Sequence, residues 1–357
     1  MNDSIPQDIK PLTSLRFLAA LMIVFYHYFV VFGAVKGWDF FEKFYLGVDF
    51  FFILSGFILL HVYSESLLTN KFNIKSFYIK RLAKIYPVHL FLTAVAAFLV
   101  FSTKGFTEDS WKHLLSHILL VHGWGIEEGL GYNMPSWSVS AEWFAYLLFP
   151  FLSALFLKFR QHSLILLGGS VLLFVLMWLS SSFWADRPLT HWTYDFSCIR
   201  ILPEFLMGMA IYNFMRENAS CKHAQVTLLL SLIASAGFIV FQVPDFLTVL
   251  SFAVLIYAAA SLNANGFGCG WGYRVLSCKP FIWLGEISYC LYMVHQILFI
   301  QIMNWWLKDI ASVFGRDIGF YVVLPALYVG LTIVSAAVLY YVIERPARTL
   351  IASLAKA

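Results

Sequence analysis

The most constraining feature of this chain is a succession of apolar stretches, each long enough to cross a lipid bilayer. A transmembrane helix needs about 20 mostly apolar residues. Ten such stretches follow one another along the 357 residues, near 14–33, 44–62, 85–101, 137–157, 163–184, 196–215, 226–241, 246–263, 281–302 and 320–343. Their apolar runs are continuous rather than alternating, which excludes a transmembrane β-barrel. We therefore expect an all-α, polytopic membrane protein with about ten transmembrane helices.

The composition agrees with a membrane location. Hydrophobic residues make up 61% of the chain and charged residues 12%, with a mean hydropathy of +0.77. Soluble domains usually contain about 45–50% apolar and about 25% charged residues. A surface this poor in charge would not keep a protein dissolved. The composition thus excludes a soluble enzyme, a disordered protein and a nucleic-acid binder.

The basic residues indicate the orientation in the membrane, because positively charged segments stay in the cytoplasm. With the N-terminus inside, the inner segments hold 16 lysines and arginines and the outer loops hold 7. The first span carries Arg16 and His27, and no small-residue cleavage site follows it, so it is not a cleaved signal peptide. We expect a multi-pass protein with both termini in the cytoplasm.

No feature divides the chain into separate domains, since it has no Pro/Ser-rich linker, repeat or low-complexity tract. We expect one transmembrane domain over 1–357, without a soluble C-terminal domain, because 14 residues follow the last span. An apolar piece of the outer loop, 114–123, is too short to span and predicts a surface or re-entrant helix. The five cysteines are odd in number and lack zinc-site spacing, so we expect small buried side chains rather than a disulfide framework or a metal site.

Ionisable residues inside spans are costly, so each one is a candidate functional residue. Arg16 and His27 lie eleven residues apart. On a helix this spacing returns to within about 20° of the same face and separates the residues by about 16 Å along the axis. One stripe thus carries a cation at the cytoplasmic edge and an imidazole deep in the membrane. The structural alternative is an arginine that reaches the interface and a buried neutral histidine.

Two carboxylates are expected near the depth of His27. Glu142 shares a helix face with Ser138, four residues earlier, and suits general acid–base chemistry with the imidazole. Asp49, near the outer edge of the second span, is placed to accept a hydrogen bond from the second imidazole nitrogen. The alternatives are a glutamate bonded within the bundle and a carboxylate favoured by a helix N-terminus.

Three further polar groups lie in or beside the spans. Arg200 and Glu204 are four residues apart and predict a structural ion pair inside the membrane. A polar stripe in the ninth span would line a cavity or join helices; it consists of Ser288, Tyr292 and His295. The basic segment 77–87, with Arg81 and Lys84, favours contact with anionic lipid, and its alternative is a grip on a phosphorylated cytosolic ligand.

Taken together, these segments resemble the acyltransferase-3 family of integral-membrane O-acylases, which commonly modify bacterial cell-surface polysaccharides. The matching pieces run in family order across nearly the whole chain. They are the Arg16 to His27 spacing after LTSL (12–15), GVDFFFILSG (47–56), the segment from Arg81 to Pro87, SWSVSAE (136–142), the segment from Arg200 to Gly208, LGEISYCLYMVH (284–295) and ERP (344–346).

The resemblance implies about ten spans, an acyl-CoA co-substrate, typically acetyl-CoA, taken from the cytoplasm, and no permanently bound cofactor. It implies that Arg16 and His27 are essential. Arg16, Arg81 and Lys84 are then the acyl-CoA-binding cations, although many family members have arginine where this chain has Lys84. The chain also lacks the hydrolase-like extension of some members.

The expected function is therefore O-acylation, most simply O-acetylation, in the bacterial inner membrane. The acceptor implied is an extracytoplasmic glycan such as lipopolysaccharide O-antigen, capsule or exopolysaccharide. CoA and a sugar both fail to cross hydrocarbon, so the reaction needs a passage with cations at its inner mouth and His27 within, as base or acyl carrier. The alternatives are a transporter of glycans or metabolites and an acylase of a small molecule. The acceptor hydroxyl and the oligomeric state stay open.

Overall fold

A computed structural model describes residues 8–31, 39–105, 107–263, 268–314 and 319–354, and no strand occurs within these ranges. The elements in chain order are α1 Lys10–Tyr26, the π-helical turn η1 His27–Val31, η2 Asp39–Leu46, α2 Gly47–Leu68, α3 Ile74–Lys104, α4 Glu108–Ile118, η3 Met134–Ser136, α5 Trp137–Lys158, η4 Arg160–His162, α6 Ser163–Ala185, η5 Leu189–His191, α7 Ser197–Asn218, α8 Cys221–Val240, α9 Asp245–Ser261, α10 Gly270–Leu276, α11 Lys279–Glu286, α12 Ser288–Phe314, η6 Gly319–Val323, α14 Leu324–Leu339, η7 Tyr340–Glu344 and α15 Arg345–Leu354.

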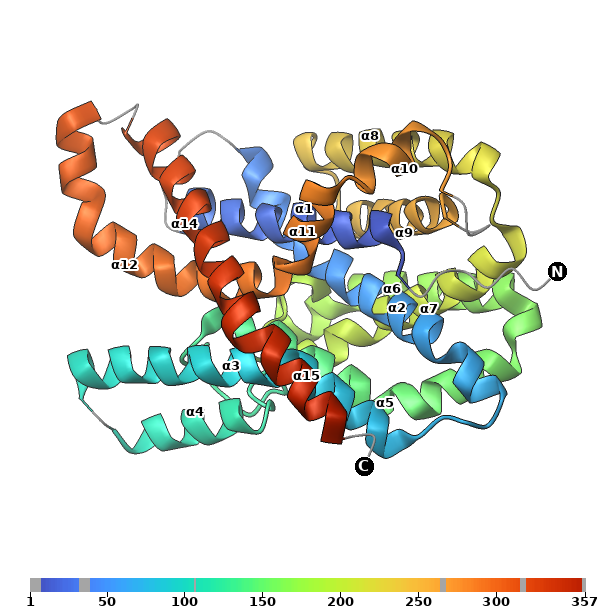
Figure 1. The fold of residues 1–357 in the computed structure, drawn as a ribbon, viewed down its shortest axis with the longest axis horizontal. Helices are drawn as coiled ribbons and strands as arrows, with labels where there is room; N and C mark the ends of the chain where they lie inside the picture. Colours follow the sequence, from blue (N-terminus) through green and yellow to red (C-terminus); the bar gives the residue numbers. More distant parts are fainter. Residues whose placement is uncertain (1–7, 32–38, 106, 264–267, 315–318, 355–357) are drawn as a thin grey trace.

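The predicted all-α polytopic class is confirmed. Eight helical segments of the described chain are long and apolar enough to cross a membrane, and two shorter apolar helices, Asp245–Ser261 and Ser288–Ile300, coincide with the eighth and ninth expected spans. The piece expected near 114–123 forms α4, which begins earlier and ends at Ile118. Most long helices run side by side along the long axis of the molecule (Figure 1).

Two expected boundaries were wrong. The third span, expected over 85–101, begins earlier, because the basic segment 77–87 is part of α3, which continues through Pro87. The span expected over 281–302 is divided at Ile287 into α11 and α12. At Gly285 a β-carbon would lie 1.9 Å from the Thr13 carbonyl oxygen, so α11 is pressed directly against the backbone of α1. Sequence hydropathy does not detect such a contact.

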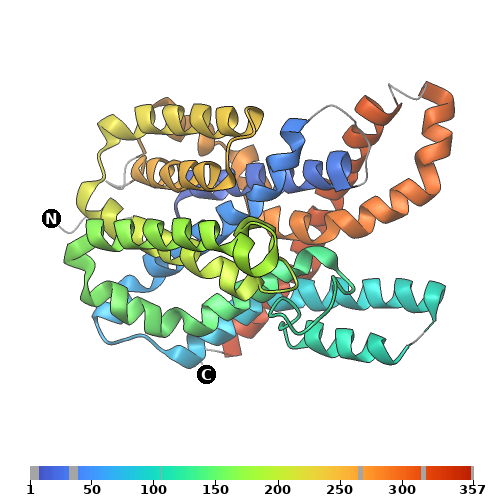
Figure 2. The same cartoon turned by 180° about the vertical axis from the view of Figure 1, so that it is seen from behind.

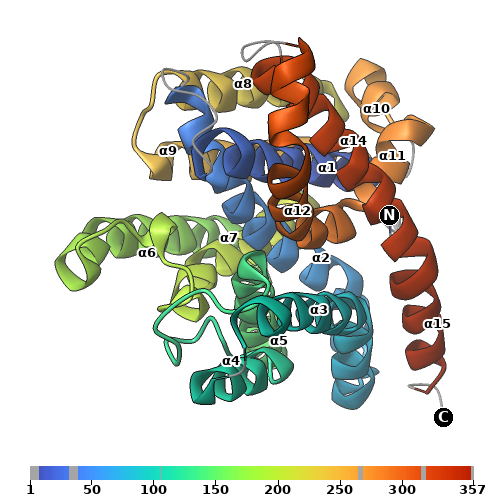
Figure 3. The same ribbon diagram turned by 90° about the vertical axis from the view of Figure 1, so that its left-hand side faces the viewer.

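Helices α2 and α7 form the centre of the bundle. Viewed from the end in Figure 3, α1, α8 and α9 lie above them and α3, α4 and α5 below. The contact between α2 and α7 is the most extensive in the fold. A β-carbon on Gly56 would lie 1.9 Å from the Phe205 carbonyl oxygen, and one on Gly208 would lie 1.9 Å from that of Ile53. Small residues allow this close approach of membrane helices.

A buried ion pair joins the same two helices. Arg200 Nη2 donates to Asp49 Oδ2 at 2.8 Å, and these side chains are 1% and 0% exposed. Arg200 Nη1 also donates to the Trp192 carbonyl at 2.9 Å, and the guanidinium lies 5.1 Å from the centre of the Trp137 ring. The predicted pair of Arg200 with Glu204 was therefore wrong in its partner. Spacing along α7 puts both side chains on one face, but the guanidinium extends across to α2.

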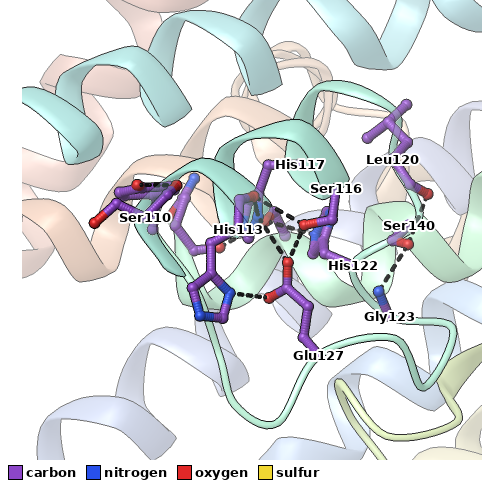
Figure 4. A network of polar contacts seen from close by, with 12 residues as sticks. Ser110, His113, Ser116, His117, Leu120, His122, Gly123, Glu127 and Ser140 are labelled. Atoms are coloured by element: carbon purple, nitrogen blue, oxygen red, sulfur yellow. Dashed lines mark hydrogen bonds and ion pairs between the residues drawn. The ribbon is translucent and has the colours of Figure 1, made fainter. Parts of the chain in front are cut away.

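A polar network closes the hairpin of α3 and α4 (Figure 4). Glu127 accepts a hydrogen bond from Ser116 and lies 2.9 Å from Nδ1 of His113. The rings of His117 and His122 stack at 3.9 Å, and His122 Nε2 donates to the Ser136 hydroxyl at 3.0 Å. The irregular segment between α4 and α5, visible in Figure 2, is thereby attached to the start of α5.

One cysteine departs from expectation. Cys269 is disulfide-bonded, whereas Cys198, Cys278 and Cys290 are free thiols. The odd count and the sequence spacing favoured small buried side chains throughout. They do not reveal which loops the hairpin of α8 and α9 brings together.

Removing one partner of the central ion pair should destabilise the protein strongly. Asp49→Ala leaves the Arg200 charge buried, which typically costs about 3–5 kcal/mol. Reversible unfolding in mixed SDS and detergent micelles measures the loss. The matched control is Glu65→Ala, at an exposed position of the same helix, which should change stability little. Wild-type stability of Asp49→Ala would contradict a central role for the pair.

The hairpin of α3 and α4 should loosen as the pH falls below about 6.5, the ordinary pKa of histidine. Burial, with the nearby rings of His117 and His89, holds the pKa of His122 well below this range. As the pH falls, His122 binds a proton in the unfolded hairpin before it does so in the folded hairpin. The stability of the hairpin therefore decreases as the pH is lowered. Hydrogen exchange of peptides within 108–131 should quicken between pH 7.5 and 5.5, after correction for intrinsic rates. His122→Gln should remove most of this dependence; equal dependence in that variant would exclude His122 as the cause.

Candidate active site

One cavity of about 160 Å³ lies between α1, α2, α3, α5 and α12. Helices distant in sequence bring six of the predicted site residues to its wall: Arg16, Arg81, Lys84, Ser138, Glu142 and Tyr292. Three of the six are cations and one is a carboxylate. The remaining wall is largely apolar and aromatic, as in Phe51, Phe52 and Tyr289. The cavity thus combines positive charge with an apolar surface.

The three cations are not equivalent. Lys84 forms an ion pair with the fully buried Glu344, which also accepts a hydrogen bond from the Cys290 thiol at 3.1 Å. Arg81 donates to the Tyr63 hydroxyl at 3.3 Å. In the part of the chain that the structure describes, neither Arg16 nor Arg81 forms an ion pair with a carboxylate. The two guanidinium groups are therefore not held in ion pairs, although the charge of Arg16 acts on Glu142 in the same cavity wall, whereas Lys84 is paired with Glu344.

Glu142 lies in the cavity wall and is within hydrogen-bonding reach of Ser55 and Tyr146. Asp49 is bound to Arg200. Among the described residues, neither carboxylate contacts His27, so the expectation that they orient the imidazole is not met. Both helices carry their acids at the predicted level, but each acid finds a nearer polar partner.

The group beside His27 is a second imidazole. His27 opens the π-helical turn η1, and π-turns within helices frequently mark functional sites. Its Nδ1 lies 2.9 Å from the Ile23 carbonyl oxygen and 3.3 Å from Nε2 of His295. The two rings meet edge to face with their centres 4.7 Å apart. His295 is completely buried, and its Nδ1 lies 2.5 Å from the Tyr292 carbonyl oxygen.

These partners assign the tautomers, because a carbonyl oxygen can only accept a hydrogen bond. Nδ1 of His295 therefore carries a proton toward Tyr292, so its Nε2 carries a lone pair. The single Nδ1–H of His27 is shared between the Ile23 carbonyl oxygen and this Nε2. Nε2 of His27 likewise carries a lone pair, which is the form that a general base or a nucleophile requires.

The cavity does not reach His27. Its wall includes Tyr292, whose hydroxyl donates to the Pro135 carbonyl at 2.7 Å and accepts from Ser138 at 2.7 Å. The Tyr292 ring lies 5.8 Å from His295, which in turn contacts His27. The structure thus has a cationic cavity and a histidine pair, but in the described residues the cavity is not continuous with His27, because Tyr292 and His295 lie between them.

The three residues of the polar stripe of α12 have different surroundings. Tyr292 lines the cavity, and His295 contacts the Tyr292 ring without lining the cavity. Ser288 donates its hydroxyl to the Gly285 carbonyl at 2.8 Å. Of the stripe that was expected to line a cavity or join helices, only Tyr292 therefore lies in the wall of this cavity. Sequence reasoning also left Tyr146 and Tyr289 out of the site, and aromatic residues are too frequent in this chain to single them out. In the sequence, Glu344 stands only within the family segment ERP (344–346), and nothing there indicates that it is the partner of Lys84.

No metal-binding arrangement of three or more His, Cys, Asp or Glu side chains occurs among the described residues. The donors in the site are guanidinium, imidazole, hydroxyl and carboxyl groups. They suit an anionic organic substrate and proton transfer.

Comparison with known proteins places these features in a family. The sequence profile described as "Acyltransferase domain" matches residues 10–344. The chain is 31% identical over 273 residues to the acyltransferase MdmB of Streptomyces mycarofaciens, covering 70% of this chain and 67% of that protein. It is 24% identical over 370 aligned positions to the O-acetyltransferase OatA of Staphylococcus aureus, covering 96% of this chain and 58% of that protein.

No solved structure matches the chain. The profile match covers all the polar groups of the cavity and both histidines. The chain belongs to the acyltransferase-3 family of membrane proteins.

Proposed function

We propose that the protein is an O-acyltransferase that moves an acyl group, in the simplest case acetyl, from cytoplasmic acyl-CoA to a hydroxyl of a glycan outside the bacterial inner membrane. The observation that carries the proposal is the cavity lined by Arg16 and Arg81, neither of which forms an ion pair with a described carboxylate, next to a pair of hydrogen-bonded imidazoles. The names of the relatives, an acyltransferase and an O-acetyltransferase, support the acyl-transfer class.

The cationic end of the cavity would hold the phosphates of CoA. Guanidinium groups bind phosphate with two parallel hydrogen bonds, and such charge-assisted bonds are strong. The apolar and aromatic wall suits the pantetheine arm, and Ser138 and Tyr292 mark the end toward the histidines. With both termini in the cytoplasm, Arg16 would face the cytosolic pool of acyl-CoA.

The histidine pair would then perform the transfer. Nε2 of His27 takes the proton of the acceptor hydroxyl while its oxygen attacks the thioester carbonyl carbon. The carbon–sulfur bond breaks, and the imidazolium returns the proton to the CoA thiolate. His295 acts as a positioning residue, because its Nε2 lone pair accepts the Nδ1–H of His27 and stabilises the imidazolium. In the covalent variant, Nε2 of His27 carries the acyl group before the hydroxyl attacks.

One movement is required before the thioester can meet His27. The Tyr292 ring must leave its place, which breaks its hydrogen bonds to Ser138 and Pro135. Both bonds are local and both partners lie at the start of α5, so a shift of this helix end would release the ring.

Loss of the imidazole should abolish most of the activity. General acid–base help contributes about 10²–10⁴-fold, so His27→Ala should lose at least about 10²-fold in CoA release from labelled acetyl-CoA. His295→Ala should lose less, and its rate should depend on pH differently, because it alters the basicity of His27. His223→Ala, at an exposed position on α8, is the control. Normal turnover by folded His27→Ala protein would refute the assignment.

Arg16 should govern donor binding rather than chemistry. A hydrogen bond to a charged group is worth about 1.5–3 kcal/mol, so Arg16→Ala should raise the KM for acetyl-CoA by roughly 10- to 100-fold. Arg16→Lys should recover much of this if charge alone matters, and little if two-point geometry matters. Arg160→Ala, outside the cavity, is the control. An unchanged KM in Arg16→Ala would exclude this cavity as the donor site.

A further inference from the structure

A second polar cluster lies on another side of His27, formed where η2, η5 and the start of α9 meet. Its centre is Asp245, which is only 5% exposed in its side chain. This carboxylate forms an ion pair with Lys43 and accepts hydrogen bonds from the hydroxyls of Tyr45 and Thr190. The Tyr45 hydroxyl also lies 2.8 Å from Nε2 of His191. None of these residues lines the donor cavity.

The cluster leads from the surface to the catalytic imidazole. The His191 side chain is 48% exposed. Its ring lies 4.7 Å from that of Tyr45, which lies 5.6 Å from that of Tyr26, and Tyr26 meets His27 edge to face at 5.3 Å. The Tyr26 hydroxyl makes no hydrogen bond within the described ranges. A series of ring contacts, from His191 through Tyr45 and Tyr26, therefore ends at His27.

The charges of the cluster indicate what it would bind. Asp245 is balanced by Lys43, so no surplus cation is available for a phosphate or a carboxylate. The charges acting on Tyr26 are those of Glu42 and Arg200, and Arg200 is paired with Asp49. Aromatic rings with polar tips offer apolar faces and hydrogen bonds together. This combination suits an uncharged, polyhydroxylated ring, and it contrasts with the cationic wall of the donor cavity.

We propose that Tyr26, Tyr45 and His191 form the acceptor subsite, which takes an uncharged sugar ring and directs one of its hydroxyls to His27. This inference rests on the proposed O-acyltransferase function. The donor would approach the imidazole past Tyr292, and the acceptor would approach it past Tyr26. Asp245 and Lys43 are positioning residues, because they hold Tyr45 and do not reach the sugar themselves.

The test uses the full chain in lipid nanodiscs, labelled acetyl-CoA, and a panel of methyl glycosides of neutral hexoses and N-acetylhexosamines as acceptor probes. Two variants remove polar tips from the subsite, Tyr45→Phe and His191→Ala. The second changes a half-exposed side chain and should leave folding intact, which thermal unfolding checks. Tyr257→Phe, which loses one hydrogen bond to the Asn218 carbonyl, is the matched control.

Each subsite variant should raise the KM for the glycoside at least tenfold, while the KM for acetyl-CoA and the slow hydrolysis of acetyl-CoA by water stay as in wild type. The control should leave all three unchanged. If wild type acetylates a glycoside and both variants keep its glycoside KM, the subsite is wrong and the function stands. If wild type consumes acetyl-CoA but no glycoside is acetylated, the glycan acceptor, and the subsite with it, is wrong.

Discussion

The ion pair between Arg200 and Asp49 is the interaction on which the arrangement of the site depends. Two charges without access to water must satisfy each other, and this requirement fixes α7 against α2 at one register. Helix α2 provides much of the wall of the donor cavity. The same guanidinium donates a hydrogen bond to the carbonyl of Trp192, which follows His191 of the Asp245 cluster in the sequence. One buried contact thereby positions elements on both sides of His27.

The distribution of charge around His27 fits the proposed substrates. The proposed acyl-CoA donor carries several negative charges, and Arg16 and Arg81 form no ion pair with a carboxylate of the described residues. The proposed sugar acceptor carries none, so a cluster in which the charges of Asp245 and Lys43 cancel is suitable. The two imidazoles, which lie between the cavity and the Asp245 cluster, are held by two backbone carbonyls, those of Ile23 and Tyr292. These backbone acceptors determine which nitrogen of each ring carries the proton.

Tyr292 connects these elements. It lines the cavity through its side chain, and its carbonyl sets the tautomer of His295. A displacement of the ring that opens the cavity toward the histidines would therefore begin at the same residue whose backbone carbonyl orients His295. Its hydroxyl is bound at the start of α5, where Ser136 also receives the hydrogen bond of His122. The hairpin of α3 and α4 is therefore joined to the same helix end. Loosening of this hairpin at low pH would weaken its attachment to the start of α5.

Much of the site could be predicted from sequence as a set of residues, and little of it as a set of contacts. The long apolar runs determined an all-helical membrane protein, because a bilayer imposes its thickness on each span separately. Costly polar groups within those spans identified Arg16, His27, Glu142 and Tyr292. Their partners were decided only by the tertiary structure: Arg200 bound Asp49 across two helices instead of Glu204 on its own, and His27 met His295 instead of a carboxylate. Hydrophobicity and spacing are local properties of the chain, whereas the partner of a buried charge depends on which helices pack together and at what register.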